Sequence, residues 1–468
     1  MSELIDTPDS LASEPTTRKL RGTLGVASIV FMVVAAAAPL GVIGGVVPLG
    51  IASGNGVGFP ATFIVATVIL LFFSVGFTAM TPHVQEAGAF FSYVRKSLGL
   101  PAGIGIAFVA IVSYLAIEAG VYGLLGPAGV SIFELFNGPT LPWWVFAAAA
   151  FAVTTYLGYR NINLSSRVLA VLLTAEIAIV AVLDLVIVAR GGDHGLSTGI
   201  VNPHAITSGS LGIGLLFAII SYVGFEATAI FRDEARTPER TIPRATYVSL
   251  ILIGVFYAIT SWALISGWGD EEAVTRATDS GSTFLGDTAQ RYIGTLGADV
   301  ITVLYFTSLF ACILSFHNVV SRYVFALSQR DVLPASLSRP HGKHGSPHRA
   351  SLWISGVVAL SVILAVVFEL DPAAQFYTWF AGTTTVGIVV LLIATSVAVL
   401  VYFAHDRHGY SQWRVRIAPS LGLIGLAGSL ILILINLKDL VGGSSVLAWV
   451  IIGLLVGAFA LGAIVGTR

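Results

Sequence analysis

The sequence predicts an all-α integral membrane protein with twelve transmembrane helices. Of its 468 residues, 56% are hydrophobic and only 10% are charged, and the mean hydropathy is +0.89. The charged residues cluster between apolar runs that are long enough to cross a bilayer. These runs occupy nearly the whole chain, so no sizeable soluble domain is expected.

The apolar runs follow one another along the chain at regular intervals. The twelve spans are expected near residues 24–50, 57–80, 101–130, 142–159, 168–189, 210–231, 246–268, 297–327, 351–369, 374–403, 416–437 and 445–466. The polar residues 1–22 have no signal-peptide pattern and are expected to form a disordered cytoplasmic tail. Because Cys312 is the single cysteine, we expect no internal disulfide and no cysteine-based metal site.

The distribution of Lys and Arg predicts the orientation. Of 24 such residues, all but Arg190, Arg276, Arg291 and Lys438 fall in the tail or in alternate loops on the same side. Cytoplasmic loops carry an excess of these residues. We therefore expect both termini to be cytoplasmic, which requires an even number of spans.

The sixth span is interrupted near its middle. It reads Ser221-Tyr222-Val-Gly224-Phe225-Glu226 before it enters a basic loop. A glycine and a carboxylate at mid-membrane depth weaken a helix, and such a break persists only where the backbone lines a cavity or meets a ligand. These residues are therefore predicted to contribute to a binding site.

The first span is also interrupted, at Ala38-Pro39-Leu40-Gly41. Proline removes a backbone donor and clashes with the preceding turn, so one helix should end before Pro39 and another should begin there. The amides of Leu40 and Gly41 would then be unpaired at the positive end of a helix dipole, which suits a carboxylate. The alternative is a plain proline kink in the first span and a packing glycine in the sixth.

Three motifs carry a resemblance to a known family. The first is Gly224-Phe225-Glu226 with Asp233-Glu234-Ala235, Pro238 and Thr241-Ile-Pro-Arg244. The second is Pro82, Glu86-Ala-Gly88-Ala-Phe-Phe-Ser-Tyr93-Val-Arg95 and Leu98-Gly99. The third is Ser321-Arg322-Tyr323, Ala326-Leu327-Ser328-Gln329-Arg330-Asp331-Val-Leu-Pro334 and Gly345-Ser-Pro347. Together they resemble the amino acid–polyamine–organocation superfamily, specifically its amino acid permease branch.

The resemblance implies a LeuT-like fold, in which two five-helix repeats are inverted relative to each other and two further helices are peripheral. The core is expected over residues 23–403, with repeats at about 23–190 and 208–403, and the peripheral helices over 404–468. The first and sixth spans then occupy corresponding positions. Interrupted helices so placed indicate a midplane binding site in secondary transporters.

The resemblance also implies how a substrate is held. In the family, the substrate carboxylate meets free amides at the break of helix one, and the ammonium meets carbonyls of helices one and six. In this chain the corresponding residues are Ala38, Pro39, Leu40, Gly41, Ser221, Tyr222, Gly224 and Phe225. Pro-Leu-Gly departs from the family's glycine-flanked trio. The aromatic gate of some members falls on Ile220, so Tyr222 or Phe225 is the expected substitute.

Carboxylates within the predicted spans need a function or a partner, because a charge at the bilayer centre costs at least ~2.5 kcal/mol on insertion scales. Glu226 matches the family's glutamate, and we expect a coupling or gating role, with bracing of the broken helix as the alternative. Asp184 lies near the outer end of helix five and is expected to be solvated or paired with Arg190. Glu118, in the middle of helix three, could bind the ammonium of a cationic substrate or brace a neighbouring helix.

Glu176 on helix five is the candidate for proton coupling. The family often has a lysine at this position, and in some members that lysine is the proposed proton site. Protonation neutralises a glutamate but charges a lysine. Because desolvation favours the neutral acid, a glutamate here is a feasible proton carrier. A sodium site would instead use Ser308 and Ser315, two turns apart on helix eight. His317 is expected to make a packing hydrogen bond.

The resemblance and the carboxylates together predict a secondary active transporter. We expect it to import an amino acid across the cytoplasmic membrane by proton symport. The alternatives are a polyamine (putrescine-like) importer, an amino acid exchanger and a nutrient sensor on the same scaffold. The segment 83–99 is expected to lie along the cytoplasmic surface and help to gate the inner mouth.

The expected partners are a small-molecule substrate and membrane lipid, and no nucleic acid. An enzyme is not expected, because the sequence shows neither a nucleophile–base pair nor a metal cluster near one face. We expect no catalytic residue, no bound metal and no cofactor, with the proton favoured over sodium as the coupling ion. The identity of the substrate and the oligomeric state stay open.

Overall fold

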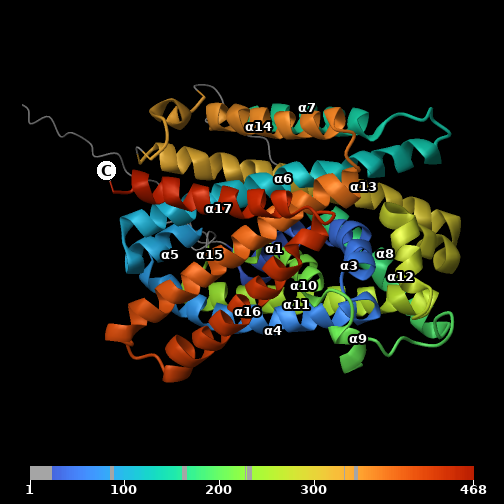
Figure 1. Ribbon diagram of the computed structural model, residues 1–468, viewed down its shortest axis with the longest axis horizontal. Coiled ribbons are helices and arrows are strands. Elements are labelled where there is room, and N and C mark those ends of the chain that lie inside the picture. The colour runs from blue at the N-terminus through green and yellow to red at the C-terminus, as the bar shows by residue number, and fades with distance from the viewer. Residues whose placement is uncertain are drawn as a thin grey trace, which may run out of the picture.

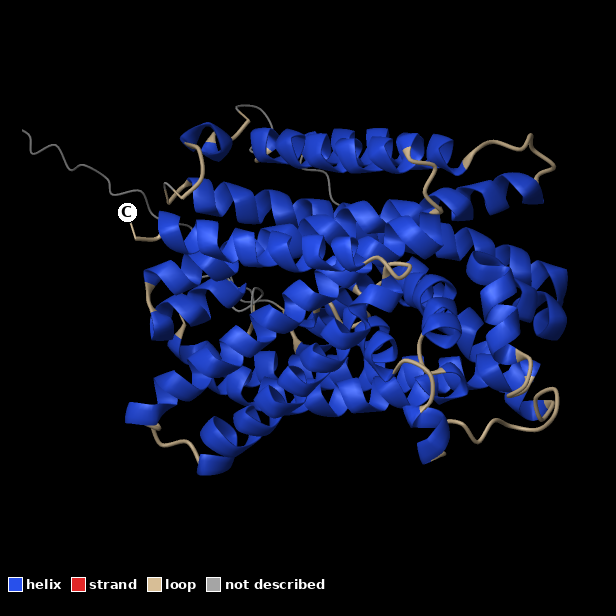
Figure 2. Cartoon of the chain, viewed as in Figure 1, coloured by secondary structure: helices blue, strands red, loops and turns tan. Residues whose placement is uncertain are grey.

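The computed structural model describes residues 24–84, 89–160, 166–226, 228, 235–330, 332–341 and 346–467. This part of the chain is built from helices and contains no β-strand (Figure 2). Ten of its helices are long and apolar enough to cross a membrane. Two further apolar helices are shorter, and they coincide with the fourth and sixth predicted spans. The all-helical prediction is confirmed, whereas the count of twelve spans stays a prediction.

The first five predicted spans correspond to five helices or groups of helices. The first comprises α1 (Val26–Ala36), α2 (Pro39–Gly41), the π-helix η1 (Val42–Val46) and α3 (Val47–Ser53). The next four are α4 (Phe59–Met80), α6 (Leu100–Leu135), α7 (Trp143–Tyr159) and α8 (Ser166–Ala189). The short elements between them are η2 (Gly56–Gly58), η3 (Thr81–His83) and α5 (Ala89–Leu98).

The second half of the chain contributes the remaining predicted spans. Its spans are α10 (Leu211–Ile220), α11 (Pro238–Trp268), α13 (Phe284–Ser328), α14 (His348–Val367), η7 with α15 (Pro372–Tyr377 and Thr378–His405), η8 with α16 (Trp413–Ile417 and Ala418–Leu440) and α17 (Ser445–Val465). The shorter elements are α9 (Pro203–Thr207), α12 (Ala273–Ser280), η5 (Gly281–Thr283) and η6 (Ala335–Ser338). The long α13 is kinked at Gly294, whose φ of 76° is not helical.

The two interrupted spans lie inside the bundle. In Figure 1, α6 and α13 run side by side through the molecule, with α7 and α14 outside them and α4, α11 and α16 on the opposite side. The helices α1 and α10 lie between these layers. The basic helix α5 and the C-terminus lie at one end of the view, and α12 lies at the other. This arrangement places both breaks where other helices can satisfy their backbone groups.

The helix α5 matches the interfacial helix predicted over 83–99. Its face with Phe90, Phe91 and Tyr93 is buried, whereas Arg95 and Lys96 are exposed. Such a division is typical of a helix that lies at a membrane surface. Its location at that surface stays a prediction.

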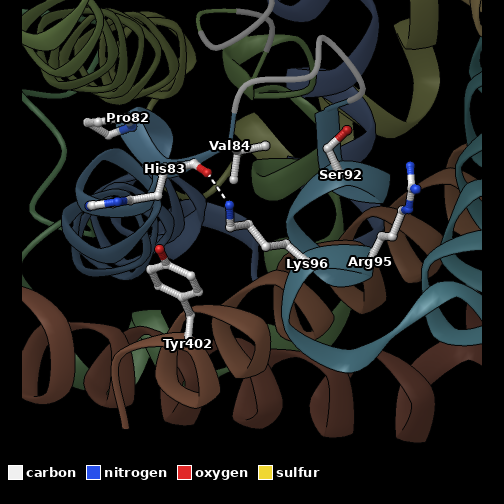
Figure 3. Close-up of a pocket in the computed structure, with 7 residues that line it drawn as sticks. All are labelled: Pro82, His83, Val84, Ser92, Arg95, Lys96 and Tyr402. Atoms are coloured by element: carbon white, nitrogen blue, oxygen red, sulfur yellow. Dashed lines mark hydrogen bonds between the residues drawn. The ribbon is translucent and has the colours of Figure 1, made fainter. Parts of the chain in front are cut away.

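A cavity of about 580 Å³ lies beside α5. Figure 3 shows its lining residues, which are Pro82, His83, Val84, Ser92, Arg95, Lys96 and Tyr402. The Lys96 ammonium donates a hydrogen bond to the carbonyl oxygen of His83, at 2.6 Å. The cavity therefore has a basic wall, at the end of the molecule that the sequence predicts to be cytoplasmic.

Several predicted features lie outside the described residues. They are the tail before residue 24, Glu86 to Gly88 of the second motif, the Asp233-Glu234 pair of the first motif, and Asp331 and Gly345 of the third.

Candidate functional site

Helix one is broken where the sequence predicts. The helix α1 ends at Ala36, and α2 begins at Pro39. Ala38, between them, has a φ of 46°, a left-handed conformation that costs an alanine about 1–2 kcal/mol. Pro39 starts the second helix with its fixed φ, and the chain continues as the π-helix η1. A plain proline kink does not describe this geometry.

The backbone amides at this break have partners within the protein. The Leu40 amide donates to Oε2 of Glu176 at 3.3 Å, and the Gly41 amide donates to Oγ of Ser308 at 3.4 Å. The Ser308 hydroxyl donates in turn to the same Glu176 oxygen, at 2.9 Å. The prediction that these amides are unpaired is therefore wrong, because helix-end amides in an apolar interior take any acceptor within reach. Here α8 and α13 supply the acceptors.

Glu176 thus occupies a position that joins three helices. It is 4% exposed and links α8 to the start of α2 and to α13. Ser315, the other candidate for a sodium site, takes no part in these hydrogen bonds, which join Glu176, Ser308 and the amides of Leu40 and Gly41. The structure therefore brings Glu176, Ser308 and the helix-one break together, and it does not add Ser315 to them.

Helix six is also broken at the predicted residues. The helix α10 ends at Ile220, and the chain continues in turns to Gly224, whose φ of 110° favours glycine. Oε2 of Glu226 accepts a hydrogen bond from the Gly224 amide at 2.9 Å. Its Oε1 accepts a hydrogen bond from the Tyr114 hydroxyl on α6. Glu226 therefore braces the break and ties it to α6, and its coupling or gating role stays a prediction.

A small central cavity of about 40 Å³ lies between the two breaks. Three of the predicted residues, Ala38, Gly41 and Ser221, are among those that line it. Most of the remaining wall is apolar: Ala37, Val42, Val46, Ile117, Val121, Leu124, Ile220, Val223, Leu309 and Phe316. Cys312 and Tyr377 add the other polar atoms. No carboxylate is found among the described residues of this wall.

The other residues predicted to bind substrate are buried beside the cavity. The Tyr222 hydroxyl bonds to the Phe63 carbonyl and the Thr67 hydroxyl, and the Phe225 ring packs edge-on against Phe73. Leu40 and Pro39 are buried at the start of α2. Gly224 holds Glu226 through its amide. These residues are not among those that line the cavity.

Glu118 is not one of the lining residues. It points to another face of α6, where its Oε1 lies 2.7 Å from Nδ1 of His317. Nε2 of His317 lies 2.8 Å from the Ser351 hydroxyl, so the three residues join α6, α13 and α14. The bracing alternative fits this geometry, and contact between Glu118 and a substrate in the cavity does not. His317 makes the buried hydrogen bonds that the sequence predicted.

Removing the Glu118 carboxylate is expected to destabilise the protein. Glu118→Leu leaves Nδ1 of His317 without its partner, so the free energy of unfolding should fall by about 1–3 kcal/mol. Denaturation of the detergent-solubilised protein measures this change. Glu134→Leu is the matched control, because Glu134 is exposed on the same helix, and we expect it to stay within about 0.5 kcal/mol of wild type. Equal stability of Glu118→Leu and wild type would contradict the bracing role.

The prediction made for Asp184 is wrong. The sequence predicts that it is solvated or paired with Arg190, but it is 7% exposed and accepts a hydrogen bond from the Thr260 hydroxyl at 2.7 Å. Arg190 lies instead over the ring of Tyr292. The face of α8 that carries Asp184 packs against α11, and the position of a residue along a helix does not reveal which face is covered.

The sequence did not predict the apolar cavity wall or the contact between Tyr114 and Glu226. One signal was present: Ile117, Val121 and Leu124 recur at helical spacing and so share one face of helix three. A membrane helix has apolar residues on every face, however, so this spacing does not single out the cavity face. Tyr114 belongs to the same helix, and nothing in the sequence indicates that it meets Glu226.

Comparison with known proteins agrees with this architecture. The model of a protein family described as "Amino acid permease" matches residues 24–462 of this chain. The chain is 24% identical over 374 residues to the branched-chain amino acid permease BcaP of Bacillus subtilis (strain 168), with 74% of each chain covered. It is 22% identical over 350 residues to the serine/threonine exchanger SteT of the same organism, covering 74% of this chain and 75% of that one. It is 24% identical over 380 residues to the low-affinity putrescine importer PlaP of Escherichia coli (strain K12), with 78% of each chain covered.

The family match covers the chain from the first helix almost to the end of the last. It includes both breaks, Glu176, Glu226 and the cavity wall. The family is one of multi-pass membrane transporters, not of enzymes. Membership in it is consistent with the LeuT-like fold that the motifs imply. This chain belongs to the amino acid permease family of the amino acid–polyamine–organocation superfamily.

Proposed function

We propose that the protein imports an amino acid with a small apolar side chain across the cytoplasmic membrane, by symport with a proton. The observation that carries this proposal is the central cavity, whose wall is formed largely by valine, isoleucine and leucine side chains. At about 40 Å³ the cavity must widen before it admits an amino acid. Once widened, its apolar wall favours an aliphatic side chain, because both surfaces lose contact with water. The branched-chain amino acid permease of Bacillus subtilis is among the relatives.

The same wall disfavours a polyamine. A diamine carries a positive charge at each end, so it cannot place an uncharged end against this wall, whereas an amino acid carries both of its charges at one end and can place its apolar side chain there. A buried charge without a partner is costly. The carboxylates nearest in the fold have other partners: Glu176 binds Leu40 and Ser308, Glu226 binds Tyr114 and Gly224, and Glu118 pairs with His317. The putrescine importer among the relatives therefore supplies the second candidate, and the serine/threonine exchanger supplies the alternative of exchange.

Glu176 is the proposed proton carrier. As a carboxylate it accepts hydrogen bonds from the Leu40 amide and the Ser308 hydroxyl and so holds α2 against α8 and α13. Bonds to an ionised acceptor are roughly twice as strong as neutral ones. Protonation of Glu176 would therefore loosen the start of α2 beside the cavity. Sodium coupling would need further oxygen ligands near Ser308, and Ser315 is not among the hydrogen-bond partners of Ser308 in the described part of the chain.

Uptake by proteoliposomes tests this function. A panel of labelled amino acids and putrescine is offered with and without an acid-outside gradient, and we expect valine, leucine or isoleucine uptake that the gradient accelerates. If the gradient accelerates the uptake of putrescine and of no amino acid, the result would favour the polyamine candidate. Uptake that depends on internal amino acid and not on the gradient would favour exchange. No uptake of any member of the panel would contradict the proposal.

Widening the cavity is expected to change the substrate preference. Val121→Ala removes two methyl groups from the wall, so larger apolar substrates such as phenylalanine should gain about tenfold in kcat/KM relative to valine. Competition uptake with pairs of labelled amino acids measures this ratio. Val109→Ala is the matched control, because Val109 is buried on the same helix outside the cavity wall, and the ratio should stay at the wild-type value. An unchanged ratio in Val121→Ala would show that Val121 does not contact the substrate side chain.

A further inference from the structure

A chain of three polar side chains, which the proposed transport does not use, lies in the interior beside the central cavity. Oε1 of Glu118 lies 2.7 Å from Nδ1 of His317, and Nε2 of the same ring lies 2.8 Å from Oγ of Ser351. The side chains of Glu118 and His317 are each 1% exposed, and Ser351 is fully buried. An imidazole that is hydrogen-bonded through both nitrogens can accept a proton on one side and release another on the other side.

The helices α6, α7, α13 and α14 enclose this chain, and each of them packs against the other three. Figure 1 shows α7 and α14 beside α6 and α13. On α7, a Cβ atom built on Gly158 would lie 2.5 Å from Nε2 of His317 and 2.9 Å from Oγ of Ser351, so a larger residue would push against both groups. Among the described residues, the titratable side chain that interacts with Glu118 besides His317 is Tyr122, on the same helix.

The second oxygen of Glu118 indicates that its carboxyl group is protonated. Oε2 is buried and has no hydrogen-bond partner in the described part of the chain. In a carboxylate this oxygen would carry part of the charge, and a buried charge without a donor is costly. In a protonated carboxyl group, Oε1 donates its hydrogen to Nδ1 of His317, and Oε2 is a neutral carbonyl oxygen. His317 then has its own hydrogen on Nε2 and donates it to Ser351.

Ser351 brings the chain of hydrogen bonds close to the end of the molecule predicted to be cytoplasmic. The helix α14 begins at His348, so Ser351 lies only one turn, about 4.5 Å along the axis, from its start. The loop that precedes α14 is on the side that Lys and Arg indicate as cytoplasmic. His348 and Ser351 share a face of α14 by their spacing. Nδ1 of His348 is buried and has no hydrogen-bond partner among the described residues, so it is available as the next proton acceptor.

The other end of the chain of hydrogen bonds adjoins the central cavity. Ile117 and Phe316, which precede Glu118 and His317 in the sequence, both line that cavity. Loss of the proton would leave a net negative charge beside this wall, in an interior where an unpaired charge is costly. Because α6 and α13 carry both the charge and the wall, the protonation of Glu118 affects the helices that shape the cavity.

We propose that Glu118 and His317 form a second proton-binding site, which exchanges its proton with the predicted cytoplasmic side through Ser351 and His348 and makes transport sensitive to internal pH. When the proton leaves, Oε1 of Glu118 transfers its proton to Nδ1 of His317, and the proton on Nε2 moves to Oγ of Ser351. The original hydroxyl proton of Ser351 passes to Nδ1 of His348. Glu118 is then ionised, His348 is protonated and the other two residues are neutral, so one proton has moved along the chain.

This site differs from Glu176 in its location and its role. Glu176 lies on α8, bonds to helix one and to Ser308, and is the proposed coupling carboxylate. Glu118 bonds instead to α13, which is joined in turn to α14. Internal pH therefore acts on Glu118 without the coupling step at Glu176. The effect on transport rests on the proposed function, whereas the binding of the proton does not.

Infrared spectroscopy of the purified protein tests the protonation of Glu118. A protonated carboxyl group has a carbonyl stretching band that a carboxylate lacks. We expect Glu118→Gln to lose one such band that the wild type shows at neutral pH. Glu134→Gln is the matched control, because Glu134 is exposed on the same helix, and it should keep the band. Retention of every carboxyl band in Glu118→Gln would overturn the proton-binding site.

Exchange of the carboxyl proton for deuterium tests the route. Deuterium shifts the carbonyl band, so the exchange can be followed after transfer to heavy water. Ser351→Ala leaves Glu118 in place and should keep the band, but its exchange should slow by about a hundredfold, because a positioned proton carrier is worth at least that factor. Ser355→Ala is the matched control, because Ser355 lies one turn later on α14 and bonds to Thr155, and it should exchange at the wild-type rate. Equal rates in Ser351→Ala and wild type would overturn the route.

Exchange of labelled leucine across the membrane of proteoliposomes tests the effect on transport. The measurement uses Glu176→Gln, which lacks the coupling carboxylate and is expected to continue exchange. Because an ionised Glu118 is costly to bury, we expect exchange to slow as the internal pH is raised. The double variant Glu176→Gln, Glu118→Gln should lose this dependence on internal pH. A dependence that persists unchanged in the double variant would overturn the sensitivity assigned to Glu118.

These results separate the proton-binding site from the proposed function. Failure of every member of the uptake panel, with the Glu118 band and its exchange through Ser351 retained, would remove the proposed transport and leave the proton-binding site standing. Acid-driven uptake by a protein in which Glu118 contributes no carboxyl band would do the reverse.

Discussion

Glutamine in place of Glu176 is expected to lower acid-driven uptake at least about tenfold, while exchange of substrate across the membrane continues. Glutamine cannot take up a proton, and its side chain keeps the neutral state that protonation would give to Glu176. The bonds to Leu40 and Ser308 are then permanently those of a neutral acceptor, so the gradient has nothing to act on. Hydrogen bonds to charged groups are worth about 1.5–3 kcal/mol, so we expect at least about a tenfold fall in gradient-driven uptake.

Two assays separate coupling from folding. Proteoliposomes with an acid-outside gradient measure driven uptake, and preloaded proteoliposomes without a gradient measure exchange. Asp184→Asn is the matched control, because Asp184 is a buried carboxylate on the same helix that bonds to Thr260 and not to helix one. It should leave both rates close to wild type. Normal acid stimulation in Glu176→Gln would show that another group carries the proton.

Phenylalanine in place of Tyr114 is expected to open the central cavity towards the predicted cytoplasmic side. The Tyr114 hydroxyl donates to Glu226, and this bond ties α6 to the break after α10. Loss of a hydrogen bond to a carboxylate is worth about 1.5–3 kcal/mol, which is at least a tenfold shift towards conformations in which the two segments separate. Cys312 is a natural reporter, because it is the single cysteine and lines the cavity.

The measurement is the rate at which a maleimide supplied to the cytoplasmic side alkylates Cys312. We expect Tyr114→Phe to raise this rate by about tenfold. Tyr292→Phe is the matched control, because the buried Tyr292 hydroxyl donates to the neutral carbonyl of Gly267, away from both breaks. Equal alkylation rates in Tyr114→Phe and wild type would contradict a gating role for the contact between Tyr114 and Glu226.

The positions of both breaks could be predicted from the sequence because their causes are local. Pro39 cannot continue a helix, and Gly224 adopts a positive φ that other residues avoid, whatever packs around them. The partners of the backbone at the break could not be predicted in the same way. Leu40 and Glu176 are 136 residues apart, and only the packing of α8 against the start of α2 brings them together.

For the buried carboxylates, too, the sequence predicted one property and only the packing of the helices determined another. Their presence in apolar spans indicated that each needs a partner, and each has one in the structure. Which partner it is depends on the face of the helix that carries the carboxylate. Glu118 and Ile117 are neighbours in sequence, yet Glu118 pairs with His317 while Ile117 lines the central cavity.

By itself the sequence determined that this is an all-helical membrane protein, where its first and sixth spans are interrupted, and which family it belongs to. These properties follow from hydropathy, from the backbone chemistry of proline and glycine, and from motifs read along the chain. The tertiary structure alone decided that Glu176 and Ser308 satisfy the broken helix and that the central cavity is apolar. Each of these depends on side chains from helices far apart in sequence, and contacts between such helices are fixed only when their faces pack.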